Sequence, residues 1–338
     1  MSLIIIKKVY INRIEKRESM SRIYIAMYHY TRDLENSRYP QIKGLDYKLF
    51  KQQLEFFNEK FNVITMEDVI ESWDNPDKKL PKNPLLLTFD DGYIDNYTYA
   101  FPLLKKYGMQ GSFFIPGKTF HEDKLLDVNK IHFILASAMP TEILKDLYMQ
   151  LDYYRSEACE EYESNDELFK KYAVENRFDC KETIFIKRIL QTVIPENIRN
   201  EITSNLFKKY VGISEKTFAR ELYMNYDQIE YMKNNGMFIG LHGYDHYWLN
   251  NLSKSELEKD VNKSLEVMSD FIDNDRWVMN YPYGSYSEEV ASYISSRGCV
   301  LGLTTEVRVV DTKNDNRFKI PRLDCNDFPP KSEIYLQK

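Results

Sequence analysis

Cysteine is scarce in this chain of 338 residues. The four cysteines, Cys159, Cys180, Cys299 and Cys325, are widely separated and include no Cys-x-x-Cys pair. This spacing argues against a zinc site built from cysteines and against a dense disulfide framework, because both need closely spaced thiols. We therefore expect reduced thiols, as in a cytoplasmic protein.

Long runs of positive charge or of apolar residues are also lacking. The 46 lysines and arginines form no long cationic stretch, and the formal net charge is −6. A nucleic-acid partner is not expected, since binding to phosphates needs clustered positive charge. The apolar run 3–6 is followed at once by two lysines and is too short for a signal sequence or a membrane span. We expect a cytoplasmic protein without a transmembrane segment.

The most informative stretch is an apolar run that ends in two carboxylates. Pro84 and three leucines lead through 88–89 into Asp90, Asp91 and Gly92. Such a run between a proline and a glycine predicts a short, fully buried strand. In parallel α/β folds the carboxyl ends of strands face the active site, where two acids can bind a cation or a proton. A solvated turn is the alternative, because aspartate and glycine are common turn residues.

Strand and helix patterns alternate through much of the chain. Residues 22–28, 111–116 and 236–241 are rich in β-branched and aromatic residues, and the first of these runs ends just before His29. Residues 46–60 have the apolar spacing of a helix. This alternation predicts an α/β fold in which a parallel sheet is covered by helices.

The pattern is interrupted between residues 118 and 235. This stretch is charged, helix-prone and poor in strand runs, and it is too long for a loop of a compact domain. We interpret it as a helical insertion. The expected organisation is an N-terminal extension at 1–21, an α/β domain formed by 22–117 and 236–325, the insertion at 118–235, and a C-terminal tail at 326–338.

Two histidines provide a second candidate site. His242 and His246 follow the strand expected at 236–241. In a helical turn, imidazoles four residues apart lie on one face and can coordinate one metal ion. Asp91 could supply a third ligand. Such a set leaves coordination positions for water and substrate. Histidine pairs also occur without metal, but together with the Asp-Asp-Gly motif at the end of another strand this pair favours a metal site.

Three motifs together resemble those of a known family. They are residues 88–92 (Thr-Phe-Asp-Asp-Gly), 242–246 (His-Gly-Tyr-Asp-His) and 281–284 (Tyr-Pro-Tyr-Gly). Here the chain is similar to the polysaccharide deacetylases of the NodB-homology type, carbohydrate esterase family 4, over residues 23–116 and 236–324. The resemblance implies a distorted (β/α) barrel of about seven parallel strands with a large helical insertion.

The resemblance also implies an activity, the metal-dependent hydrolysis of N-acetyl, or less often O-acetyl, groups on sugars. By position, Asp91, His242 and His246 would hold a divalent metal. Zinc is expected, with iron, cobalt, nickel and manganese as alternatives. Metal-bound water would attack, with Asp90 as general base and the Tyr283 backbone N–H binding the oxyanion. This is sound chemistry, because a metal polarises the carbonyl and acidifies water.

The chain departs from the common family pattern in three places. Asn280 stands where an arginine usually opens the third motif, no tryptophan follows Trp277, and no histidine follows His246 to serve as the C-terminal acid. In Tyr28-His29 and in 281–284 the chain resembles the biofilm poly-N-acetylglucosamine deacetylases, whose strand order is permuted. That resemblance implies that His29 is the general acid.

Two further residues are candidates for supporting roles. Arg322 could replace the missing arginine in orienting Asp90, and Asp324 could orient His29. An ordinary surface charge is the alternative for each.

Other functions stay open at this point. A phosphatase with an aspartate nucleophile would need Asp-x-Asp, but Thr88 occupies the required position. A two-carboxylate glycosidase would need no histidine pair. Hydrolysis of a non-sugar amide, a cyclic imide or an O-acetyl ester, and an inactive carbohydrate-binding module, are the remaining alternatives. We expect the substrate to be an acetylated sugar or polysaccharide precursor, and the sequence leaves the oligomeric state open.

Overall fold

The computed structural model describes residues 22–75, 77–157, 162–177 and 179–338, which form two compact units. The first unit comprises the described residues up to Asp33 together with Gly44–Asp123 and Leu222–Lys338. The second comprises Leu34–Lys43 and Lys124–Glu221. Its second segment is thus shorter than the insertion expected at 118–235, and the unit also includes residues 34–43, which precede that insertion. The expected extension at 1–21 lies outside the described residues.

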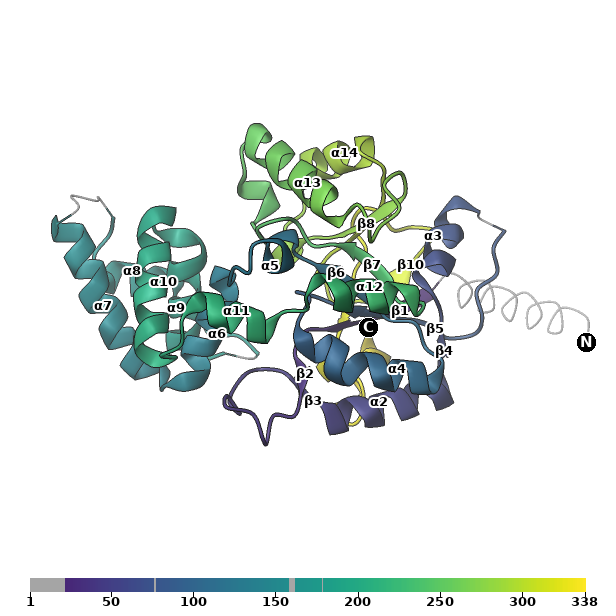
Figure 1. The fold of residues 1–338 in the computed structure, drawn as a ribbon, viewed down its shortest axis with the longest axis horizontal. Coiled ribbons are helices and arrows are strands. Elements are labelled where there is room, and N and C mark those ends of the chain that lie inside the picture. Colours follow the sequence, from purple (N-terminus) through teal and green to yellow (C-terminus); the bar gives the residue numbers. More distant parts are fainter. Residues whose placement is uncertain (1–21, 76, 158–161, 178) are drawn as a thin grey trace, which may run out of the picture. The chain divides into compact units, whose positions relative to one another are not determined.

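A curled, mostly parallel sheet is the centre of the first unit (Figure 1). The strands are β1 (Arg22–Tyr28), β2 (Thr31–Arg32), β3 (Leu45–Asp46), β4 (Asn62–Val63), β5 (Pro84–Phe89), β6 (Ser112–Ile115), β7 (Phe238–Leu241), β8 (Trp277–Asn280), β9 (Cys299–Leu303), β10 (Val310–Asp311) and β11 (Leu323–Asp324). Nine of them join in one sheet, and β2 pairs separately with β3.

The strand order positions the ends of β1 and β5 side by side. The main path runs β10-β1-β5-β6-β7-β8-β9, parallel throughout except for β10. After β10, Ile320 pairs with Leu303 of β9 and Leu323 pairs with Ala26 of β1. This segment therefore lies between β9 and β1 of the curled sheet. The predicted α/β class with a distorted barrel is confirmed.

The buried strand predicted before the two acids is β5, and every residue of it is buried. Leu85, Leu87 and Phe89 pack in the larger apolar cluster, which includes residues of the covering helices. Leu86 packs in a second cluster with residues of other strands. Burial on both faces explains the continuous apolar run, because a central parallel strand has no solvent face.

Helices cover the sheet of the first unit, with α2 beside α4 and α13 beside α14 (Figure 1). They are α2 (Tyr47–Lys60), α3 (Met66–Asp74), α4 (Phe101–Tyr107), α5 (Gly117–His121), α12 (Tyr226–Asn234), α13 (Lys254–Met268) and α14 (Glu288–Ser296). The helix predicted at 46–60 is α2, whose N-cap Asp46 accepts a hydrogen bond from the Lys48 N–H. Its buried stripe of Phe50, Leu54 and Phe57 fixes its orientation on the sheet.

The second unit is helical and buries apolar side chains such as Ile134, Leu147 and Leu206. Its helices are α6 (Asp127–Ser137), α7 (Pro140–Glu157), α8 (Asn165–Tyr172), α9 (Lys181–Arg188), α10 (Glu196–Tyr210) and α11 (Glu215–Leu222). Single turns of 3-10 or π-helix in the two units lie at Asn96–Ala100, Ile189–Val193, Leu249–Asn251, Pro282–Gly284, Cys325–Asp327 and Ile334–Gln337. Among the described residues, no helix is both long enough and apolar enough to cross a membrane.

Three of the four cysteines fall within the described residues. Cys180, Cys299 and Cys325 carry free thiols. Cys159 lies outside the described residues.

Candidate functional site

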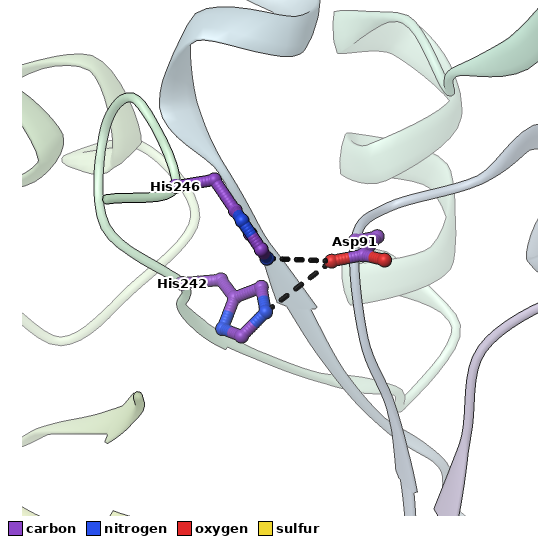
Figure 2. Close-up of side chains that lie close together, drawn as sticks. All are labelled: Asp91, His242 and His246. Carbon is purple, nitrogen blue, oxygen red and sulfur yellow. Dashed lines mark ion pairs between the residues drawn. The ribbon is translucent and has the colours of Figure 1, made fainter. Parts of the chain in front are cut away.

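Three side chains of metal-ligand type converge at the carboxyl ends of β5 and β7 (Figure 2). The Nε2 atoms of His242 and His246 lie 3.3 and 3.2 Å from one oxygen of Asp91, Oδ1. All three side chains are buried, and one donor atom from each lies within 4.8 Å of the others. Bonds of ~2.1 Å at tetrahedral angles would place zinc ligands ~3.4 Å apart. The spacing therefore fits one divalent ion.

The two oxygens of Asp91 have different surroundings. Oδ2 accepts a hydrogen bond of 2.5 Å from the hydroxyl of the buried Tyr93. The buried Oδ1 has no hydrogen-bond partner in the part of the chain that the structure describes. A buried carboxylate oxygen without a partner is costly unless a cation binds it. The free oxygen is the one that faces both imidazoles, so this observation also fits a metal ion.

The two histidines turn their Nε2 atoms toward Asp91. His242 donates from Nδ1 to the backbone oxygen of Asn280 at 2.6 Å, so in the neutral ring the lone pair lies on Nε2. Burial lowers the pKa of His246, although the Asp91 carboxylate acts in the opposite direction. Burial alone would raise the pKa of Asp91, but its contacts with the two histidines lower it well below its usual range. Neutral imidazoles and an ionised carboxylate are the forms that bind metals.

The prediction that His242 and His246 lie in a helical turn is wrong. The residues after β7 form a loop in which Gly243 and His246 have φ values of 69° and 56°. A right-handed helix cannot contain such residues, because their backbone is left-handed. The imidazoles still reach the same oxygen, since the loop folds back between them.

Backbone strain is concentrated around the centre. Of the five non-glycine residues with positive φ in the described ranges, three are Asp91, His246 and Tyr283. Such conformations cost energy and persist where the surrounding structure enforces them, often at functional sites. The strain therefore supports the choice of these residues.

Asp90 is held by Arg322 in a buried ion pair. The guanidinium donates two hydrogen bonds to the Asp90 carboxylate, from Nη1 to Oδ1 at 2.8 Å and from Nη2 to Oδ2 at 2.9 Å. Its Nε donates to the backbone oxygen of Thr304, and Nη1 also donates to Thr88 Oγ1. Arg322 is 0% exposed and Asp90 2%. Burial raises the pKa of Asp90, but the charge of Arg322, with that of a protonated His29, outweighs it and lowers the pKa to about 2. Asp90 is therefore ionised at neutral pH.

His29 lies beside Asp90 because their strands are neighbours. Tyr28 at the end of β1 is in register with Phe89 at the end of β5, so the residues that follow both strands meet. The Nε2 atom of His29 is 3.6 Å from Asp90 Oδ2, and 40% of its side chain is exposed. Unlike the two other histidines of the site, His29 can be reached from solvent.

Tyr283 also lies at this centre, whereas Asp324 faces another partner. The ring of Tyr283 meets His246 edge-on at 4.6 Å and stacks on Trp248 at 4.4 Å. The Asp324 carboxylate accepts hydrogen bonds from the Asn326 backbone and side chain, at 2.8 and 2.7 Å. Within the described ranges it makes no hydrogen bond or ion pair with His29, so we assign it no role there.

Sequence reasoning missed Tyr93 and the backbone of Asn280. Tyr93 follows the Asp-Asp-Gly motif directly, and a hydroxyl two positions after a metal-type carboxylate was an available signal. The carbonyl of Asn280 orients His242, a role that no side-chain pattern could reveal.

Comparison with known proteins identifies related chains. A family model described as polysaccharide deacetylase matches residues 77–149 and 187–301, more than half of the 338 residues. YxkH of Bacillus subtilis (strain 168), provisionally named a polysaccharide deacetylase, is 33% identical over 105 residues. That match covers 31% of this chain and only 35% of the length of YxkH.

Solved structures are similar at lower identity. The deacetylase PplD of Streptococcus pyogenes, in complex with acetate, has a TM-score of 0.56 at 17% identity, covering 94% of this chain and 96% of its own. IcaB from Ammonifex degensii has a TM-score of 0.53 at 16% identity, covering 94% and 98%. The BpsB deacetylase domain from Bordetella bronchiseptica has a TM-score of 0.53 at 15% identity, covering 91% and 97%. At these identities the likeness shows a shared fold.

The Arg322 pair predicts a pH-dependent loss of stability in Arg322→Leu. At pH 7 the variant leaves Asp90 buried without its partner, so its free energy of unfolding should fall by about 3–5 kcal/mol. In the wild type, the folded pKa of about 2 lies below the unfolded value of about 3.9, so the stabilisation is complete above about pH 4 and is lost towards pH 2. The variant has the opposite dependence: without the guanidinium, burial raises the folded pKa of Asp90 above the unfolded value, so stability rises as the pH falls and Asp90 is protonated. The difference should therefore shrink as the pH falls.

Urea unfolding of wild type and variant at pH 7 and pH 4 measures the loss at neutral pH and its decrease at the lower pH. Arg308→Leu is the control, because Arg308 pairs with Glu306 and Asp315 at the surface and should contribute about 1 kcal/mol or less. Equal losses for the two variants would contradict the structural importance of Arg322.

Proposed function

Because the chain belongs to the polysaccharide deacetylase family, we propose that it hydrolyses the N-acetyl group of a sugar or polysaccharide precursor and releases acetate. The observation that carries the proposal is the convergence of Asp91, His242 and His246 on one point, next to the Asp90 carboxylate. A base and a set of metal ligands on neighbouring strand ends are what amide hydrolysis requires.

Asp91, His242 and His246 would hold one divalent metal, and zinc suits two imidazoles and a carboxylate. When bound, the ion polarises the acetyl carbonyl and acidifies water. The unpartnered Oδ1 of Asp91 and the donor spacing of 3.2 and 3.3 Å support this assignment. Asp91 would bind the ion through Oδ1, because the Tyr93 hydroxyl is hydrogen-bonded to Oδ2.

Asp90 would act as the general base. Its low pKa keeps it ionised at neutral pH, and the two-pronged bond from Arg322 fixes the direction of its lone pairs. In this state it accepts a proton from the attacking water. The backbone N–H of Tyr283, a residue whose ring packs against His246, would bind the negative oxygen that develops on the acetyl carbonyl.

His29 would act as the general acid. Amines are poor leaving groups at neutral pH unless their nitrogen is protonated as the bond breaks. The imidazole is partly exposed, so it can exchange protons with solvent. His29 can thus deliver a proton to the departing sugar amine.

The metal site predicts a selective loss in His246→Ala. Elemental analysis should find about one divalent ion per wild-type chain and almost none in the variant, because one of three protein ligands is gone. His132→Ala, a histidine variant in the second unit, should keep the wild-type content. Equal metal in His246→Ala and wild type would contradict the site.

Acetate release tests the activity itself. The wild-type chain should release acetate from an N-acetylglucosamine oligomer, stop when a chelator removes the metal, and resume when zinc is restored. Metal-loaded protein that releases no acetate from this oligomer would contradict the proposed substrate class.

The acid role predicts a substrate-dependent loss in His29→Ala. The variant should lose a factor of about 10²–10⁴ in rate on an N-acetylated sugar, the usual scale for a positioned proton donor. It should lose far less on an activated acetyl ester, whose leaving group needs no proton. Metal content and thermal unfolding of the variant serve as controls. Equal losses on the two substrates would contradict the assignment.

A further inference from the structure

The loop between His242 and His246 is tied down by a buried carboxylate. Asp260, on α13, accepts a hydrogen bond from the backbone N–H of Tyr244 on Oδ2 at 2.9 Å and from that of Asp245 on Oδ1 at 3.0 Å. Only 6% of Asp260 is exposed. Both oxygens of one buried side chain thus engage consecutive N–H groups of the loop that carries the two imidazoles.

The carbonyl groups of the same loop are held by a second helix. The oxygens of Gly243 and Tyr244 accept hydrogen bonds from the backbone N–H groups of Gly117 and Lys118, at 3.1 and 3.0 Å. These donors belong to the start of α5, which packs against α13. The Lys118 side chain also forms an ion pair with Asp245. The loop is therefore fixed from both sides.

We propose that Asp260 is a positioning residue that sets the separation of the His242 and His246 imidazoles for metal binding. The inference rests on the proposed function, because it presupposes a metal at these residues. A loop with positive φ at Gly243 and His246 has no helix or strand to hold its shape. Its shape depends on outside partners, and Asp260 supplies the acceptors for its N–H groups.

A carboxylate suits this position better than any neutral side chain. Both groups that face Asp260 are donors, and an aspartate offers two acceptor oxygens. An asparagine offers one acceptor oxygen and one NH₂ group, which would face an N–H of the loop. Space is also restricted, since a Cβ atom added at Gly243 would lie 3.1 Å from Asp260 Oδ2. Asp260→Asn therefore changes one contact while keeping the size of the side chain.

Zinc affinity of the full chain tests the inference. The metal-free protein is titrated with Zn²⁺ in competition with a chromophoric chelator, and Co²⁺ is then added so that its visible absorption reports the ligand geometry. Asp260→Asn should bind Zn²⁺ about 10–100-fold more weakly than wild type, the usual effect of losing a partner of a metal ligand, and should show a changed Co²⁺ spectrum.

Ser264→Ala is the matched control. Ser264 is fully buried on α13 one turn beyond Asp260, and its hydroxyl has no hydrogen-bond partner among the described residues. Its loss should leave zinc affinity and the Co²⁺ spectrum as in wild type. If Asp260→Asn does not fold, Asp260→Glu, which keeps the charge and shifts the oxygens by one methylene, is measured in its place with the same expectation.

The outcomes separate this inference from the proposed function. If wild type binds Zn²⁺ and the Asp260 variant binds it equally well with an unchanged Co²⁺ spectrum, Asp260 does not position the ligands. A lower melting temperature with unchanged zinc affinity would likewise overturn the inference, because it would show a role in folding alone. If wild type binds no Zn²⁺, the metal site falls and this inference falls with it.

Discussion

Arg322 reaches Asp90 from the segment that lies between β9 and β1, so one buried side chain links the return of the chain to the acids that follow β5. Removing both charges from water is costly, and the attraction between them compensates only when their remaining polar atoms are also bonded. The guanidinium meets this condition through the Thr304 carbonyl and the Thr88 hydroxyl. Without the guanidinium, an ionised Asp90 would be an uncompensated buried charge, which strongly destabilises the fold.

The same pair separates the roles of two adjacent carboxylates. Asp90 faces a permanent positive charge, so its orientation is fixed and its negative charge is balanced. Asp91 faces two imidazoles and a tyrosine hydroxyl, which leaves one oxygen for a cation. Two residues of identical chemistry thus take different tasks because their surroundings differ. In the proposed reaction, the first moves a proton and the second binds the ion.

Much of this arrangement could be predicted from the sequence. The apolar run ending in two aspartates predicted β5, the run before His29 predicted β1, and parallel pairing then brought their following residues together. The candidates Asp90, Asp91, His242, His246, His29 and Arg322 all lie in this region of the first unit. Family motifs supplied the roles that composition and periodicity could not.

The backbone of the loop that carries His242 and His246 could not be predicted in the same way. A spacing of four residues suits both a helical turn and a loop that folds back, and the positive φ of His246 is invisible in the sequence. Asp260 was out of reach for another reason. Periodicity shows which side of α13 is buried, but it does not show which polar residue on that side meets the N–H groups of a loop fifteen or so positions earlier in the chain. The second unit likewise includes Leu34–Lys43 through contacts distant in sequence.

The most direct test of the proposed role of Asp90 is to measure the deacetylation rate and the metal content of Asp90→Asn. We predict that this variant retains the wild-type metal content, because Asp90 is not one of the three converging residues. Its deacetylation rate should be lower by a factor of about 10²–10⁴, because asparagine cannot accept the proton from water. Loss of the metal would show that Asp90 is a ligand. A wild-type rate in the metal-loaded variant would show that another group is the base.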